Sequence, residues 1–104
     1  MNAEHLMSLF KKFNITPKTG QCKLEDNCGC AVTALAMELG KSGKDSKENY
    51  ACTENMYGWH FIEGLYSGFD GAQYNERYLN QHEDIREGYL IGKELNTHFN
   101  LGTL

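Results

Sequence analysis

The sequence feature that most constrains the fold is a pair of similar glycine-containing segments in the second half of the chain. They read EGLYSG at residues 63–68 and EGYLIG at residues 87–92, and each carries two glycines four positions apart. A glycine inside a helix costs about 1 kcal/mol relative to alanine, so four of them cost on the order of 4 kcal/mol. We expect close helix approach to offset this cost, because glycines four apart share one face and a face without side chains admits a neighbouring backbone.

This close approach can take place in three ways. The two glycine faces can pack within one chain, between two chains as a homodimer, or around a small molecule held in a glycine-lined groove. Similar patterns let helices touch in membranes, but charged residues flank both segments here and no apolar stretch approaches the roughly 20 residues that cross a bilayer. A membrane protein is therefore not expected.

Apolar periodicity predicts helices over most of the chain, and segments of alternating polarity are nearly absent. The predicted helices cover roughly residues 3–13, a stretch that starts after Asp26 and Asn27 and stops at Gly40, a central helix over residues 53–69, and a last helix over about 81–99. We predict an all-α fold in one domain of residues 1–104: a compact bundle of about five helices, with two long C-terminal helices packed through glycine-bearing faces.

Two pairs of residues have the spacing of a capping box, in which a helix-capping side chain is followed three positions later by glutamate. They are Asp45 with Glu48, and Asn80 with Glu83. The first pair predicts a further helical start near residue 45, and the second predicts the start of the last helix.

The charge balance limits the partners of the chain. Lys and Arg number 10 against 14 Asp and Glu, a net charge of −4, and no basic run is longer than Lys11 and Lys12. A nucleic-acid or anionic-membrane surface is therefore not expected. The N-terminal segment lacks the apolar core of a secretory signal, so we expect a cytoplasmic location, where cysteines are usually reduced.

Three of the four cysteines lie within CKLEDNCGC, residues 22–30, and the fourth is Cys52. Four thiols at Cys22, Cys28, Cys30 and Cys52 could complete a tetrahedral zinc site if they converge, but their spacing does not match the paired knuckles of structural zinc sites. A disulfide and ordinary buried cysteines are the alternatives.

A nucleophilic thiol is a further alternative, because a helix N-terminus lowers the pKa of a cysteine placed there. DNCGCAVTALAMELG, residues 26–40, resembles the active-site helix of the cysteine peptidases that process double-glycine leader peptides, in which Asp-Cys-Gly opens an alanine-rich helix. Over these fifteen or so residues, the resemblance implies Cys28 as nucleophile, with Gln21 as an oxyanion donor and His60 as base.

His60, Glu63 and Ser67 share one stripe of the predicted central helix, and Glu94 with His98 form one comparable pair in the last helix. Such a line can transfer protons or bind a metal. The simpler interpretation is that it forms the solvent-facing edge of the helix.

These observations favour a small cytoplasmic binding or regulatory module without a cofactor, with a homodimer as one arrangement and enzymatic activity not the favoured interpretation. Two alternatives stay open. One is a thiol-dependent function, whether redox, metal-binding or cysteine-hydrolase-like, centred on Cys28 and Cys30. The other is a small-molecule binder between the glycine-rich helices.

Overall fold

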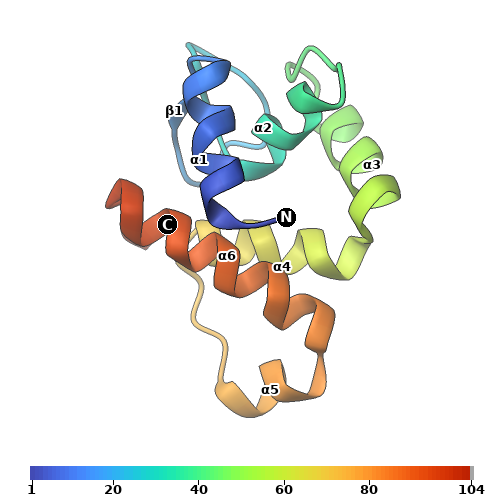
Figure 1. Ribbon diagram of the computed structural model, residues 1–104, viewed down its shortest axis with the longest axis vertical. Helices are drawn as coiled ribbons and strands as arrows, with labels where there is room; N and C mark the ends of the chain where they lie inside the picture. The colour runs from blue at the N-terminus through green and yellow to red at the C-terminus, as the bar shows by residue number, and fades with distance from the viewer. Residues whose placement is uncertain (104) are drawn as a thin grey trace.

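The computed structural model describes residues 1–103, and this part of the chain forms six α-helices and one very small parallel sheet, which lies at the edge of the molecule beside α1 (Figure 1). The elements in chain order are α1 (Ala3–Lys12), β1 (Thr16–Pro17), β2 (Cys28–Gly29), α2 (Ala31–Glu38), α3 (Ser46–Tyr57), α4 (Trp59–Phe69), α5 (Glu76–Gln81) and α6 (Glu83–Phe99). The prediction of a compact, mostly α-helical bundle is confirmed.

Helices α4 and α6 pack through their glycine faces, as the sequence predicts. A methyl group added at Gly64 would overlap the carbonyl oxygen of Ile85, and one added at Gly88 would overlap the carbonyl oxygen of Phe61. Gly68 and Gly92 face the opposite backbone in the same way, at Tyr89 and Leu65 respectively. The four glycines are therefore the condition for the close approach of these two helices.

The two helices run parallel, because contacts advance along both in the same direction (Figure 1). The contact of Gly64 with Ile85 and that of Gly88 with Phe61 are equivalent under a shift of 24 residues, and the same holds for the other two glycines. The pair is thus close to two-fold symmetric. At each glycine a Cα–H bond points at the opposing carbonyl, a weak hydrogen bond that recurs at close helix interfaces.

The glycine faces of α4 and α6 pack against each other within the chain. The sequence alone left open that these faces contact a second chain or a ligand instead. The opposite backbone fills the space at all four glycines, so no small molecule can lie between the two helices there. The expectation of a homodimer through this face therefore loses its basis.

The predicted central helix over residues 53–69 is wrong as a single element. Gly58 adopts a φ of +89°, so α3 ends at Tyr57 and α4 begins at Trp59. Glycine adopts this backbone conformation readily and most other residues do not, so the chain bends at Gly58 between the two helices (Figure 1).

The start of the second helix is also displaced. Asp26 and Asn27 both have positive φ and form the turn before β2, which pairs with β1 in parallel. Helix α2 begins only at Ala31, with Cys30 at its N-cap. Short polar side chains tolerate left-handed backbone, and here that property makes a turn rather than a helix cap.

One of the two predicted caps is correct. Asp45 accepts hydrogen bonds from the amides of Lys47 and Glu48 at the start of α3. Asn80 caps nothing, because the short helix α5 occupies this stretch with Asn75 as its cap, and α6 starts after His82.

The main core lies where α1, α2, α4 and α6 meet. Phe10 of α1 stacks on Phe69 of α4 at 5.9 Å between ring centroids, and residues 31–36 of α2 are buried throughout. A smaller cluster forms where α5 packs on α6. In the described residues no helix combines the length and the apolar character needed to span a membrane.

Candidate functional site

The chemically most distinctive site is formed by two cysteines and a tyrosine. Cys22 lies in the thiol loop, which we define as residues 18–30, and its Sγ is 2.6 Å from the hydroxyl of Tyr50 on α3. Cys30, at the other end of the loop, is 1% exposed and its thiol lies beside that of Cys22. The amide of Cys30 donates to the carbonyl of Gln21 at 2.9 Å, so the two ends of the loop lie side by side.

The three groups have unequal acidities. Hydrogen bonding from the Cys30 thiol, and to a lesser extent from Tyr50, lowers the pKa of Cys22 to about 6, although burial opposes this effect. The hydrogen bond to Cys22 and nearly complete burial raise the pKa of Cys30 well above its usual value. Burial likewise raises the pKa of Tyr50. The favoured state is therefore a Cys22 thiolate that accepts hydrogen bonds from a neutral thiol and a neutral phenol.

Side-chain amides hold the thiol loop in place. The Gln21 amide donates to the carbonyls of Glu25 and Cys28 across the loop. Asn49, fully buried on α3, donates to the carbonyls of Cys22 and Gly43, both at 2.8 Å. These bonds connect the loop to α3 and fix the position of the Cys22 backbone.

A shallow cleft of about 480 Å³ reaches Cys22 from the surface. Its lining residues come from the loop itself and from the start of α3: Lys18, Thr19, Gly20, Gln21, Cys22, Lys23, Glu25 and Ser46. Cys22 is partly exposed and Cys30 is not, so a small solute can meet the first thiol only.

The four cysteines do not converge on one metal site. Among residues 1–103, no group of three or more histidine, cysteine, aspartate or glutamate side chains is placed to hold a metal ion. Cys28 approaches the carbonyl of Asp26 and Cys52 that of Asn49, each at 3.5 Å. The convergence that the four-cysteine hypothesis requires is therefore missing.

The peptidase-like arrangement is not assembled either. Cys28 belongs to β2 rather than to a helix start, and the Gln21 amide is bonded to backbone carbonyls. His60, in the first turn of α4, stacks against Trp59 and lines a different pocket with residues 81–85. The pairing of Cys22 with Cys30 was missed, because a left-handed turn at Asp26 and Asn27 brings these residues together and sequence spacing does not show it.

The polar stripe of α4 is not simply a solvent-facing edge. Ser67 is buried, at 8% exposure, and its hydroxyl accepts a hydrogen bond from Tyr74 at 2.9 Å. Glu94, from the comparable pair on α6, lines a cleft at the surface instead.

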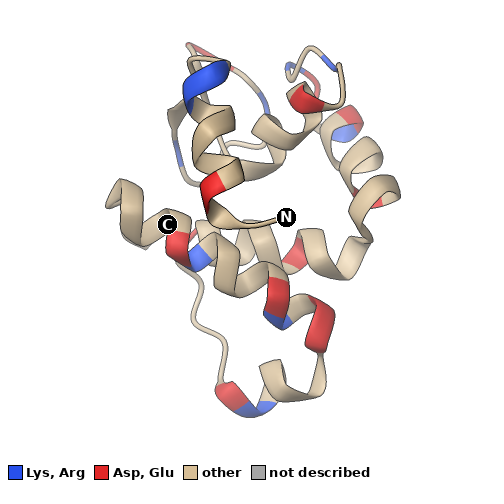
Figure 2. Cartoon of the chain, viewed as in Figure 1, with Lys and Arg blue, Asp and Glu red and all other residues tan. Residues whose placement is uncertain are grey.

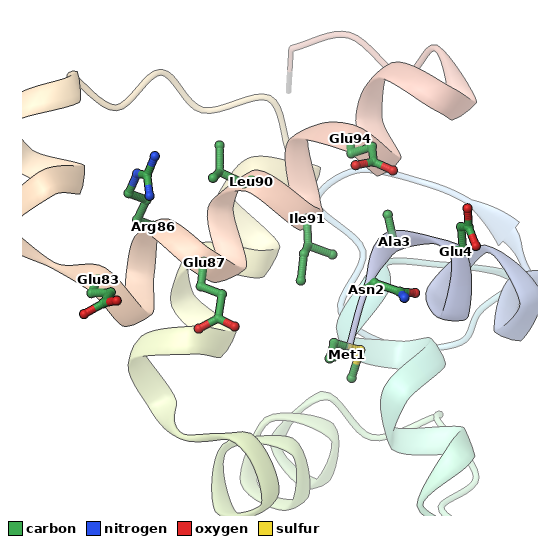
Figure 3. Close-up of a pocket in the computed structure, with 10 residues that line it drawn as sticks. All are labelled: Met1, Asn2, Ala3, Glu4, Glu83, Arg86, Glu87, Leu90, Ile91 and Glu94. Atoms are coloured by element: carbon green, nitrogen blue, oxygen red, sulfur yellow. The ribbon is translucent and has the colours of Figure 1, made fainter.

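That cleft, of about 640 Å³, separates the N-terminal end of α1 from one face of α6 (Figure 3). In Figure 3 the side chains of Glu87 and Ile91 extend from α6 toward the side on which Met1 lies. Two of its large apolar side chains, Leu90 and Met1, are 47% and 46% exposed. The ten lining residues are Met1, Asn2, Ala3, Glu4, Glu83, Arg86, Glu87, Leu90, Ile91 and Glu94.

The side chains that line the cleft have a net negative charge. Four glutamates against one arginine give −3 among its lining side chains, compared with −4 for the whole sequence. Figure 2 shows these acidic residues along α6 and at the start of α1. Sequence reasoning missed this cleft: the spacing of Glu83, Glu87 and Glu94 along one helix is a signal for its α6 side, but it does not indicate that α1 lies opposite.

Comparison with known proteins adds no family: no protein-family model, no curated protein and no solved structure matches the chain.

Proposed function

We propose that the protein is a cytoplasmic binding module that holds a basic, amphipathic helix of a partner protein in the cleft between α1 and α6. The observation that carries the proposal is Leu90, a leucine at 47% exposure that lines the cleft together with Glu87 and Glu94. Such a surface fits a helix that presents apolar anchors on one face and lysine or arginine beside them.

Charge selects among the occupants of the cleft. A surface with a side-chain charge of −3 repels nucleic acid and attracts a cationic partner. It also disfavours a second copy of the same cleft face to face, since both copies carry the same charge. A homodimer remains a prediction, and light scattering tests it: a mass of one chain, 11.8 kDa, at all concentrations would contradict it.

The binding experiment uses a synthetic helical peptide of about 15 residues with leucines at helical spacing and lysines beside them. Its control replaces every lysine with glutamate. We expect the basic peptide to shift the amide resonances of Glu87, Leu90 and Ile91, with weaker binding at high salt. The acidic peptide should leave them unchanged.

Matched variants locate the contact. Leu90→Ala should weaken peptide binding about tenfold, because an apolar anchor in a cleft carries a large part of the binding energy. Met56→Ala removes an equally exposed side chain, at 58% exposure, from α3 outside the cleft and should have no effect. Equal binding of the two peptides, or equal effects of the two variants, would rule the proposal out.

A further inference from the structure

The thiol pair is independent of the cleft between α1 and α6, since the two sites share no residue. Three geometric features set it apart from ordinary buried cysteines. Cys22 is reached by a surface cleft, its sulfur is within hydrogen-bond distance of Tyr50, and it packs against the core cluster that contains the buried Cys30, whose amide donates to the carbonyl of the adjacent Gln21.

We propose that Cys22 and Cys30 are a peroxide-reactive pair, in which Cys22 is oxidised first and Cys30 then closes a reversible disulfide. The substrate class is a small hydroperoxide, with hydrogen peroxide as the simplest member. This goes beyond the binding function above, and either one can fail without the other.

The reaction takes place in two balanced steps. The Cys22 thiolate attacks one peroxide oxygen, so that an S–O bond forms and the O–O bond breaks; the departing hydroxide takes a proton and leaves as water. The product is a sulfenic acid on Cys22. The sulfur of Cys30 then attacks the sulfur of Cys22 and its proton passes to the departing hydroxide; an S–S bond forms, the S–O bond breaks and a second water leaves. Two thiols have then lost two electrons to one peroxide.

The environment assigns the two roles. The hydroxyl of Tyr50 and the thiol of Cys30 both donate toward Cys22, which stabilises the nucleophilic thiolate. Cys30 cannot meet a peroxide directly at 1% exposure, but it is placed to attack a sulfenic acid next to it. Cys28 and Cys52 contact only backbone carbonyls and are not expected to join the reaction.

The test treats the reduced, folded protein with one equivalent of hydrogen peroxide and follows its mass and its free thiols. We expect loss of two hydrogens and of two thiols, fully restored by dithiothreitol. Trypsin separates Cys22 from Cys30 but leaves Cys28 and Cys30 on one peptide, so the assignment needs variants. Cys28→Ser should still form the disulfide, whereas Cys30→Ser should stop at a sulfenic acid that dimedone traps on Cys22.

A second measurement addresses the role of Tyr50. Tyr50→Phe removes a donor to Cys22, so the midpoint of its alkylation rate should move from about 6 toward the value of an ordinary thiol. Tyr66→Phe is the matched control, because Tyr66 packs edge-on against Tyr50 without a hydrogen bond to Cys22 and should leave the midpoint nearly unchanged. The proposal is overturned if four free thiols survive peroxide, if the disulfide includes Cys28 or Cys52, or if Cys30→Ser gives no sulfenic acid.

Discussion

The α4/α6 pair and the thiol loop are held in place by opposite means. Between the two helices, backbone meets backbone at four glycines, and the side-chain amide of Asn96 adds one hydrogen bond, to the carbonyl of Phe69. The thiol loop has almost no regular structure and depends on single polar side chains, Gln21 within it and Asn49 beneath it.

This difference teaches that the two regions should respond to different changes. The α4/α6 contact should be lost when a side-chain atom is added between the helices, because a close-packed interface can accommodate it only if the two helices move apart. A loop held by buried hydrogen bonds fails when a donor is removed, because the abandoned carbonyls cannot reach water. Each region can therefore be perturbed selectively.

The largest expected effect is that of Gly64→Ala. Its new methyl group would overlap the Ile85 carbonyl, which is backbone and cannot turn aside. We expect the free energy of unfolding to fall by about 3 kcal/mol or more, even though alanine's higher helix propensity returns about 1 kcal/mol. Urea unfolding, followed by circular dichroism, measures the change.

The control for this prediction is Gly40→Ala. Gly40 has φ +89° and no atom near its added methyl group, so only backbone strain is expected, about 1 kcal/mol. If both variants lose the same small amount, close packing is not what the glycines of α4 and α6 provide.

An intermediate effect is expected from Asn49→Ala. The Cys22 carbonyl loses a donor and the Gly43 carbonyl keeps only the amide of Leu24, which should lower the free energy of unfolding by about 2 kcal/mol. The same variant should speed alkylation of Cys30 in the folded protein, because the loop that covers it is released. Thr53→Val, one turn later on α3, removes only a hydroxyl bonded within its own helix and should change neither quantity much.

The sequence predicted the glycine interface better than the thiol loop for a physical reason. Residues such as Gly88 and Gly92 lie on one face by helix geometry alone, so their pattern is readable. The parallel direction of α4 and α6 could not be predicted in the same way, because it depends on the long connection through α5. The pairing of Cys22 with Cys30 depends on left-handed residues at 26 and 27 and on a donor, Asn49, that lies far along the chain.

The smallest expected effect is a pH dependence of stability. The pKa of Cys22 is about 6 in the folded protein against 9.0 for a free thiol, so folding favours the thiolate. Its contribution should be absent below pH 6, grow as the pH rises and be complete near pH 9. The groups that face it are Cys30, Tyr50, Tyr66 and Asp70.

The titration of these neighbours affects stability outside the range of pH 6 to 9. Cys30, Tyr50 and Tyr66 have raised pKa values, so any stability that they contribute as neutral groups is lost only above pH 9, while the carboxyl of Asp70 titrates at the acidic side. Urea unfolding at pH 6, 7.5 and 9 should show rising stability in the wild-type protein. Cys22→Ser should abolish the rise, and a rise that persists in this variant would contradict the assignment of the thiolate.

The most direct test of the glycine-packed scaffold is a nuclear Overhauser experiment on the folded protein. The parallel register places the Cα hydrogens of Gly64 next to the amide of Tyr89, and those of Gly88 next to the amide of Leu65. We predict strong cross-peaks for both pairs in the same spectrum. Absence of both, or cross-peaks in reversed order with Gly64 near Lys93 and Gly68 near Ile85, would contradict the arrangement.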